Sequence, residues 1–429
     1  FKITLNHACE FSLAKLQLKM IALFIFIILL IYSIYNKEQG LLFTAILAPA
    51  LLSIGIYSIG SVFFCLSVVY FFLFKDQIKN NNFLGSPFAY VIIITILMYL
   101  VSGFVAQEKH FYALFRFLIE FTVVPVCCWT VFSKGNRLND FIHILVKASL
   151  LVVAYTFIET ILKDNPYVHL CIAEGSFSGE FIDDVRFGLR RCQAFFSYHE
   201  TLGGFCMINI GFCVCLLYLE NLDKHLRSKI AWIIGLLGMC VFLTGSRSSI
   251  LATMVALLPI FFAKKKYLLF IPLLFCVVYF SMPEYFSEIL SSITNSDSVN
   301  GSNSEMRNNQ FELSVYYLMR ANNIFWGNGF SFADNNVVGV DSGMAGAESI
   351  WFRIIMDQGI MGIVCTAYFF IYSIYCSAKV FGLFLFFPLA YLVARTVAVV
   401  PAMTLSYIIP YIMFLVILKK YNIKIRKND

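Results

Sequence analysis

Residues 202–219 read LGGFCMINIGFCVCLLYL and contain no charged side chain. A run of this length suits one α-helical crossing of a bilayer, which needs about 20 apolar residues. The whole chain agrees, because 60% of its 429 residues are hydrophobic and only 13% are charged, against about 25% charged in a soluble domain. This composition excludes an ordinary soluble enzyme, a coiled coil and a disordered scaffold. The sequence therefore predicts an integral membrane protein.

Further apolar stretches flank this one, so hydropathy predicts an all-α, polytopic fold with about 12 to 13 transmembrane helices. The middle of 41–74 is rich in Gly and Ser, which predicts either a tight hairpin or a broken helix there. Thirteen crossings would put the N-terminus on the side that its own lysines disfavour, so one early stretch is expected not to cross. The predicted stretches are 20–35, 41–57, 60–74, 88–105, 112–132, 142–162, 202–219, 231–244, 247–263, 267–282, 350–376, 380–398 and 402–418.

Lysine and arginine gather in alternate connections between these stretches. One set of connections, with the C-terminal tail, holds 16 of them, whereas the short connections of the other set hold only Lys109 and Arg247. The positive-inside rule places the basic set in the cytoplasm, so the long loops 163–201 and 283–349 face outward. We expect two parts, an N-terminal bundle with the first loop over 1–201 and a second region over 202–429. The net charge of +7 is modest and one-sided, and nucleic acid is not an expected partner.

The cysteines predict neither a metal site nor a cofactor. Most of the 13 lie in apolar runs, where a thiol packs as a small hydrophobic group, and no CxxC pair has the spacing of metal ligands. Cys171 and Cys192 share the first long loop. A disulfide between them is expected if this loop faces an oxidising compartment.

The first long loop carries a cluster of cations. Arg186, Arg190 and Arg191 lie within six positions and precede the segment AFFSYHETLGG at 194–204. Three arginines beside a membrane predict an anion site. The alternative is a solvated cluster balanced by the two aspartates before it. His199 belongs either to this site or to the polar start of the next helix.

A second set of cations lies inside apolar sequence. Arg247 interrupts an apolar region within LTGSRSSI at 243–250, and a cation at membrane depth is a functional candidate, although it can also extend from a short turn to the interface. Arg395 in a late helix raises the same question. Arg116 and Glu120 have the four-residue spacing of an ion pair within one helix.

The second long loop predicts a helix at the membrane surface. SNSE at 302–305 is a capping box, and Arg307, Phe311, Val315 and Leu318 follow at helical spacing, as in an amphipathic helix at the interface. Beyond Arg320 the chain turns through WGNG at 326–329.

The chain then enters the membrane again at ESIWFR, residues 348–353. Glu348 at the helix start either favours the helix dipole or serves chemistry. Arg353 and Asp357 are spaced for an ion pair.

Four segments in this order resemble the family of O-antigen ligases and O-antigen or capsule polymerases. They are 191–203, 243–248, 307–329 and 348–362. The last is the most specific, because ligases carry a His followed by Ser, Thr or Asn, nine residues and then Gly-x-x-Gly. Here Ser349 precedes nine residues, Gly359 and Gly362, and Glu348 takes the His position.

The resemblance implies a C-type glycosyltransferase-like fold, with 202–429 as the ligase-like region. It implies transfer of a glycan from an undecaprenyl-diphosphate carrier to a sugar hydroxyl on the outer face of the cytoplasmic membrane, without metal or cofactor. The implied partners are the undecaprenyl-diphosphate-linked oligosaccharide, membrane lipids, a chain-length regulator and a flippase.

Within this reading Glu348 is the candidate catalytic base, and the substrate-binding candidates are Arg191, Arg247, Arg307, Arg186, Arg190, Arg320 and His199. Glu in place of His favours a polymerase over a ligase that joins glycan to the lipid A core. A transporter of lipid-linked sugar is the alternative of another class. Transporters usually show repeats and broken mid-membrane helices, whereas the polar residues here collect in two outer loops, which favours surface chemistry.

Overall fold

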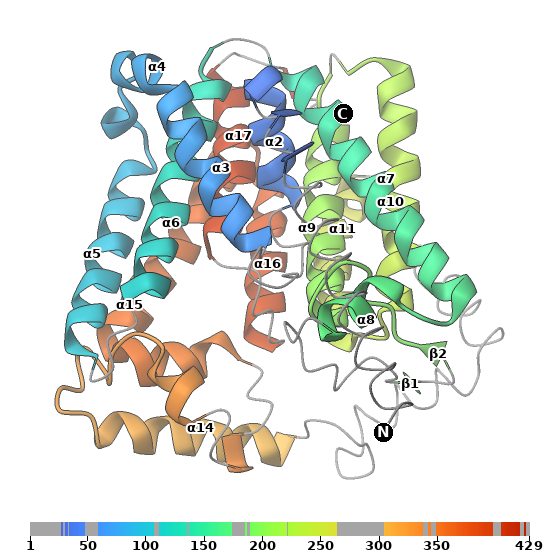
Figure 1. Cartoon of the computed structure of the whole chain (residues 1–429). Helices are drawn as coiled ribbons and strands as arrows, with labels where there is room; N and C mark the ends of the chain where they lie inside the picture. The colour runs from blue at the N-terminus through green and yellow to red at the C-terminus, as the bar shows by residue number, and fades with distance from the viewer. Residues whose placement is uncertain are drawn as a thin grey trace, which may run out of the picture.

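The computed structural model describes residues 27–28, 31–32, 34–47, 59–106, 111–134, 137–173, 185–186, 189–220, 222–263, 304–337, 342–344, 349–397, 405–420 and 424–425. Over these ranges the chain is almost entirely helical, and the helices stand side by side in a bundle with α14 lying across one end (Figure 1). The predicted helical class is confirmed.

Among the described residues, four helices are long and apolar enough to cross a membrane, namely α7 (Leu138–Leu162), α9 (His199–Leu217), α10 (Lys224–Leu243) and α15 (Ile350–Val380). Shorter apolar helices stand beside them, so a membrane protein is supported, whereas the predicted count of 12 to 13 crossings is not established. The predicted stretch 267–282 lies outside the described residues.

The remaining elements are α2 (Lys37–Leu47), α3 (Ile59–Leu73), α4 (Lys75–Asn80), η2 (Phe83–Gly85), α5 (Ala89–Val105), α6 (Phe111–Phe132), α8 (Pro166–Ala173), β1 (Val185–Arg186), β2 (Leu189–Arg190), α11 (Arg247–Ala263), α14 (Ser304–Met319), η5 (Ala333–Val337), η6 (Ser342–Met344), η7 (Gly382–Leu385), α16 (Phe386–Val397), η8 (Leu405–Tyr407) and α17 (Ile409–Lys420). The strands β1 and β2 form one short antiparallel pair.

Helices α2 and α3 run in opposite directions, as the hairpin interpretation of 41–74 predicts. Lys134, just after α6, lies 3.5 Å from the Glu38 carboxylate at the start of α2 and also contacts Gln77 in α4, which follows α3. The start of α2 and the end of α3 therefore lie at the same end of the bundle. Residues 48–58 between the two helices are outside the described ranges.

Those basic connections that the structure describes lie together at this end. The Lys419 ammonium, at the end of α17, donates to the carbonyl of Lys379 at 2.9 Å, and Glu220 N, just after α9, donates to Lys424 O at 3.0 Å. Helix α4 and the end of α17 are at the top of Figure 1, whereas α14 and both strands are at the bottom. The basic connections and the long-loop elements thus lie at opposite ends of the bundle, as the distribution of basic residues predicts.

Helix α9 lies at the centre of the bundle. Its small residues permit close contact with its neighbours, because a Cβ on Gly203 would lie 2.2 Å from Ser249 Oγ of α11 and one on Gly211 would lie 2.7 Å from the Phe387 ring of α16. Small residues serve the same purpose generally in membrane helices. The charge-free run that predicted a crossing is therefore also the run around which the other helices pack.

The expected disulfide between Cys171 and Cys192 is absent. Both thiols are free and buried, and Cys192 Sγ lies 3.2 Å from Thr160 Oγ1. Burial raises the pKa of each thiol to about 12. Thiols in such surroundings stay protonated and unreactive, so they serve here as packing groups.

Candidate functional site at the α14 end of the bundle

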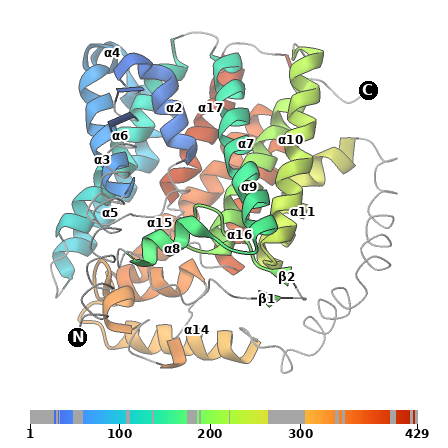
Figure 2. The ribbon, with the colours of Figure 1, turned by 45° about the vertical axis from the view of Figure 1, so that its right-hand side comes forward.

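The described residues among those singled out in the two long loops lie at the end of the bundle opposite the described basic connections. Figure 2 shows α14, the start of α15, α8 and the two strands gathered at this end. The first loop contributes 189–198, and the second contributes α14 and the chain that follows it up to η5.

Arg191 connects two of the segments that carried the family resemblance. Its side chain is only 2% exposed, and its Nε donates to the carbonyl of Thr244 at 2.8 Å. Its Nη2 donates to the carboxylate of Glu200 at 3.1 Å, and His199 contacts the same carboxylate. The guanidinium is therefore held between the first loop, α9 and the turn before α11.

The turn between α10 and α11 requires glycine. Gly245 has a φ of +59°, and a Cβ there would lie 3.2 Å from Cγ of Arg191. Cys192 N donates to Leu243 O at 3.0 Å, so backbone as well as side chain ties the turn to the first loop. Arg247 is the first residue of α11 and is partly buried. It thus lies at a short turn between two helices, next to the Arg191 contact.

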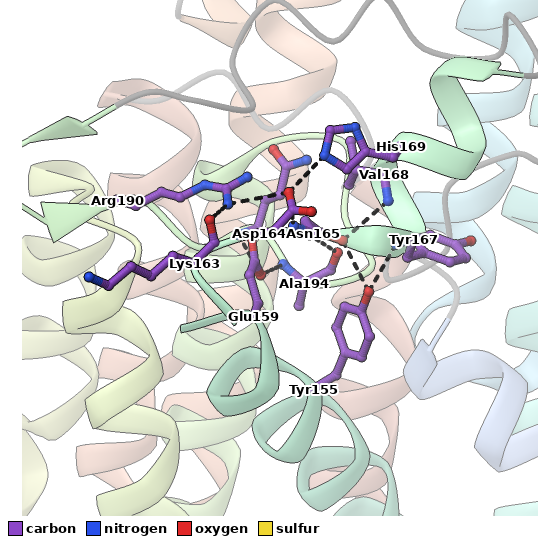
Figure 3. A network of polar contacts seen from close by, with 11 residues as sticks. Tyr155, Glu159, Lys163, Asp164, Asn165, Tyr167, Val168, His169, Arg190 and Ala194 are labelled. Atoms are coloured by element: carbon purple, nitrogen blue, oxygen red, sulfur yellow. Dashed lines mark hydrogen bonds and ion pairs between the residues drawn. The ribbon is translucent and has the colours of Figure 1, made fainter. Parts of the chain in front are cut away.

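A buried carboxylate that sequence reasoning missed supports this loop (Figure 3). Glu159, 2% exposed in the last turns of α7, accepts from Ala194 N at 2.7 Å and from Gln193 N at 3.3 Å. Asn165 Nδ2 donates to Ala194 O at 2.9 Å. Ala194 has a φ of +49°, which is unfavourable for a residue with a Cβ, and these bonds hold it there.

The outer side of the same network contains Arg190. It donates to Lys163 O and lies 3.5 Å from the Asp164 carboxylate, which His169 contacts at 2.7 Å (Figure 3). The hydrogen bond with His169 lowers the pKa of Asp164. Arg190 therefore fastens the loop to the end of α7, while the side chain of Arg186 lies outside the described residues.

Helix α15 is broken at Gly359, and the loop after α14 enters the break. Gly359 has φ 62° and ψ −152°. The broken helix and the loop exchange backbone hydrogen bonds in both directions. They run from Asn328 N to Met356 O at 2.9 Å, Gly329 N to Asp357 O at 2.8 Å, Ile360 N to Ile324 O at 3.2 Å and Met361 N to Phe325 O at 3.0 Å. The loop thereby satisfies the peptide groups that the break leaves without helical partners.

The glycines of the two motifs face each other across this contact. A Cβ on Gly327, where φ is +66°, would lie 2.7 Å from Gly359 N, and a Cβ on Gly359 would lie 2.3 Å from Ile324 O. Any side chain at either position would push the two backbones apart. The Gly-x-Gly and Gly-x-x-Gly patterns thus belong to one backbone contact, between residues 324–329 and the break in α15 at 356–361, which we call the interlock.

Helix α14 packs against the rest of the protein through a face that combines polar and apolar residues. Gln310 and Ser314 are fully buried and Leu318 is 8% exposed, whereas Phe311 is 50% exposed. The helix packs on α15 and η6 with these polar side chains inward. Ser314 Oγ donates to Gln310 O at 2.6 Å, which satisfies one of these polar groups. Its place at the membrane interface stays a prediction for this helix.

The arginines of α14 differ in their surroundings. Arg307 is partly buried, and Arg320 is exposed with its guanidinium 4.4 Å from the centre of the Tyr316 ring. The helix begins at Ser304, within the predicted capping box. The roles of both arginines in binding remain predictions.

The start of α15 shows one correction. Arg353 does not pair with Asp357 but with Asp334 of η5, at 2.9 Å. Asp357 lies just before the break and accepts from Ala333 N at 2.7 Å. The inserted loop brings η5 against this turn and supplies both partners, so the within-helix pair does not form.

Ser349 is the N-cap of α15 and accepts from Trp351 N at 3.3 Å. Glu348 immediately before it, and the side chain of Arg116 in the predicted pair with Glu120, lie outside the described residues. Within the described ranges, no group of three or more His, Cys, Asp and Glu side chains is arranged to hold a metal ion.

Fold and site together define a helical membrane protein with two loops gathered at one end of its bundle, the second of which is interlocked with α15. Residues 232–367, from α10 to the first half of α15, match a family model described as O-antigen ligase. The match supports an O-antigen ligase/polymerase family membrane protein. It includes the turn before α11, Arg307 and the glycine interlock, whereas Arg191 and His199 precede it. No curated protein matches the chain.

Because the buried Glu159 carboxylate accepts hydrogen bonds from Gln193 N and Ala194 N, we predict that it positions the first loop. A Glu159→Ala variant leaves two buried amides without an acceptor, at about 1–3 kcal/mol each, so we expect the loop to loosen and Arg191 to lose its fixed position. Limited proteolysis after Arg190 in purified protein should accelerate. Lys147→Ala, on the same helix, is the matched control. Equal proteolysis of Glu159→Ala and wild type would show that the loop does not depend on this carboxylate.

Proposed function

We propose that this protein transfers a glycan from an undecaprenyl-diphosphate carrier to a sugar hydroxyl on the outer face of the cytoplasmic membrane, and that it polymerises repeat units of a surface polysaccharide such as O-antigen or capsule. The observation that carries the proposal is the family match, which coincides with the interlock of α15 and the second loop. Ligation of glycan to the lipid A core is the second candidate, because the matching family model is described by that activity.

The reaction requires a base and a stabilised leaving group. The acceptor hydroxyl attacks the anomeric carbon, its proton passes to the base, the bond from that carbon to the diphosphate oxygen breaks, and the electron pair leaves with the lipid diphosphate. Glu348 is the proposed base, since it directly precedes the cap of α15. A carboxylate serves as a base at neutral pH when partial burial raises its pKa.

Fixed cations are suited to the charge that develops on the diphosphate. Arg191, Arg247 and Arg307 are proposed to contact the donor, with Arg186, Arg190, Arg320 and His199 around them. The support from geometry is that Arg191 is held rigidly by a carbonyl and a carboxylate. A guanidinium that is already oriented before the substrate binds loses little conformational freedom on binding, and its hydrogen bonds to the diphosphate are strong in an enclosed site.

Lysine at the two central arginines is expected to be a poor substitute. Arg191→Lys and Arg307→Lys keep the charge but lose the planar fork, and a hydrogen bond to a charged group is worth about 1.5–3 kcal/mol, so polymer synthesis should fall by about tenfold or more. The rate of polymer formation in membranes, at matched protein level, measures this. Arg137→Lys, at the opposite end of the bundle, is the control. Full activity of both lysine variants would exclude these arginines from the donor site.

The function itself is tested by a gel of the cell's surface glycan with and without the protein. Loss of a polymerase leaves single repeat units on the acceptor. Loss of a ligase leaves long polymer on the lipid carrier. An unchanged glycan profile after deletion would contradict both candidates and return the choice to a transporter or another membrane function.

A further inference from the structure

An apolar pocket lies between α5 and α6, on the outside of the bundle. It has a volume of about 410 Å³, and its walls include Leu100 and Phe104 of α5 and Phe115 and Leu118 of α6. Pockets of about 300–1,000 Å³ commonly hold small organic molecules. Every side chain in the lining is a hydrocarbon, so the part of a ligand that enters this pocket must be hydrocarbon as well.

The sequence builds the pocket from one glycine and several large side chains. A Cβ on Gly103 would lie 2.2 Å from Leu114 Cδ2, so Leu114 of α6 rests directly on the backbone of α5. Leu114, which also lines the pocket, is 7% exposed, whereas Phe104, Phe111 and Phe115 of the lining are 72%, 58% and 61% exposed. The pocket therefore opens outward, to the side that faces lipid in a membrane protein.

The apolar character of the pocket does not by itself select an occupant. Lipid tails are as apolar as leucine, so no hydrophobic driving force brings one chain rather than another to a lipid-facing surface. A particular lipid is favoured there when its head group binds nearby, because its chain is then held close to the pocket. The neighbours of the pocket therefore identify the lipid that it suits.

The loop of the interlock contacts α5 beside the pocket. Phe330 N donates to Ser102 O at 3.1 Å, and Ser102 Oγ donates to Asp357 O, at the break in α15, at 3.3 Å. Ser102 immediately precedes the glycine of the pocket. A Cβ on Gly329 would lie 2.2 Å from Ala106 Cα, so the loop backbone also touches the end of α5. The pocket and the interlock thus share the last turn of α5.

The same loop also packs an aromatic ring against both helices. Tyr99 of α5 and Phe117 of α6 are stacked with ring centres 4.0 Å apart, and the Phe330 ring lies 6.0 Å from Tyr99 and 6.4 Å from Phe117. In the chain, Tyr99 and Phe117 are the neighbours of Leu100 and Leu118 in the pocket lining. The loop and both walls of the pocket therefore form one packed unit.

We propose that this pocket holds the isoprene units next to the diphosphate in the polyprenyl chain of the donor lipid. The assignment rests on the proposed function and adds to it the place of the lipid part of the substrate. The pocket lies where α5 ends and α6 begins, on the α14 side of the bundle (Figure 1). A chain in it therefore belongs to the leaflet whose head groups are at that end. A diphosphate bound there keeps its own chain close to the pocket, which favours this chain over those of free phospholipids.

Photo-crosslinking in nanodiscs tests which lipid occupies the pocket. The photoreactive residue p-benzoylphenylalanine replaces either Phe115 in the pocket or, as the control, Ile161, which is 78% exposed on α7. The nanodiscs contain the full chain, phosphatidylcholine, phosphatidylglycerol and a small share of undecaprenyl diphosphate, and mass spectrometry identifies the captured lipid. Position 115 should capture undecaprenyl diphosphate at about tenfold its share of the bilayer or more, because head group and chain bind together. At position 161 capture should follow the composition of the bilayer.

A side chain that fills the pocket provides the second measurement. Leu118→Trp places a larger ring in the pocket and should reduce capture at position 115 to the share of the lipid in the bilayer. Leu151→Trp makes the same change at a position of α7 that is 48% exposed and outside the pocket, and it should leave the enrichment unchanged. Gel filtration and circular dichroism establish that each variant is folded. Leu100→Trp, in the opposite wall, carries this measurement if Leu118→Trp does not fold.

Capture at position 115 in proportion to the bilayer composition would overturn the assignment. Enrichment of phosphatidylglycerol, or a crosslink to a second copy of the chain, would overturn it as well, since the pocket would then hold another occupant. Enrichment of undecaprenyl diphosphate that persists in the folded tryptophan variants would show that its chain lies elsewhere. Failure of the proposed function would appear instead as an unchanged surface glycan after deletion, whatever the crosslinking result.

Discussion

Replacement of Glu348 by Gln is expected to lower polymer synthesis by about 10² to 10⁴-fold, the usual contribution of a general base. The amide keeps the size and hydrogen-bonding capacity of the carboxylate but does not accept the proton of the acceptor hydroxyl. Protein level and donor binding should stay near those of wild type, because the change removes no apolar contact. The rate of polymer formation in membranes that contain equal amounts of the two proteins measures the effect.

Glu312→Gln, an exposed residue of α14, is the matched control and should leave the rate unchanged. If Glu348→Gln retained more than about a tenth of the wild-type rate, its effect would fall outside the range of a general base. Glu348 would then be only an acidic residue that favours the start of α15.

Replacement of Gly359 by Ala is expected to destabilise the protein by about 3 kcal/mol or more and to abolish polymer synthesis. Two effects combine. Alanine disfavours the φ of 62°, and its Cβ would lie 2.3 Å from Ile324 O and 2.6 Å from Gly327 N. Both obstacles are backbone atoms, so the loop must leave the break and its four backbone hydrogen bonds with α15 are lost. A thermal melt of purified protein in detergent measures the loss.

Gly235→Ala provides the control, because a Cβ on this glycine of α10 has no atom within 4 Å. Its melting temperature should differ little from wild type, as for most surface substitutions. Equal melting temperatures of Gly359→Ala and Gly235→Ala would show that the interlock contributes nothing to stability. Activity of Gly359→Ala at the wild-type level would show that the site does not require the break in α15.

The spacing of residues along the chain was enough to identify the glycines of the family motifs. Gly359 and Gly362 were recognised from their distance to Ser349, and Gly327 and Gly329 from their place after an arginine-bearing helix. The spacing could not reveal that Gly327 and Gly359 touch, because it carries no information on which segments meet. The inserted loop also explains why Arg353 pairs with Asp334 and not with the residue one turn away.

For the site residues too, the sequence identified some of the residues, whereas the tertiary structure supplied their contacts. Arg191 was predicted from its place in a cationic cluster, but its partners, the Thr244 carbonyl and Glu200, come from two other segments. Glu159 could not be identified from the sequence, because a single carboxylate near the end of an apolar helix belongs to no recognisable motif. Its acceptor role depends on residues 193 and 194, which lie more than 30 positions further along the chain.

The sequence by itself determined that this is a helical membrane protein, where most of the described helices lie and which family its second half resembles. These properties depend on hydrophobicity, charge and spacing along the chain, which act locally. Only the tertiary structure decided which face α14 buries, where α15 breaks and which groups hold Arg191. Such properties arise when peptide groups and charges of distant segments are removed from water together, because each must then find its partner among whatever the packing brings within reach.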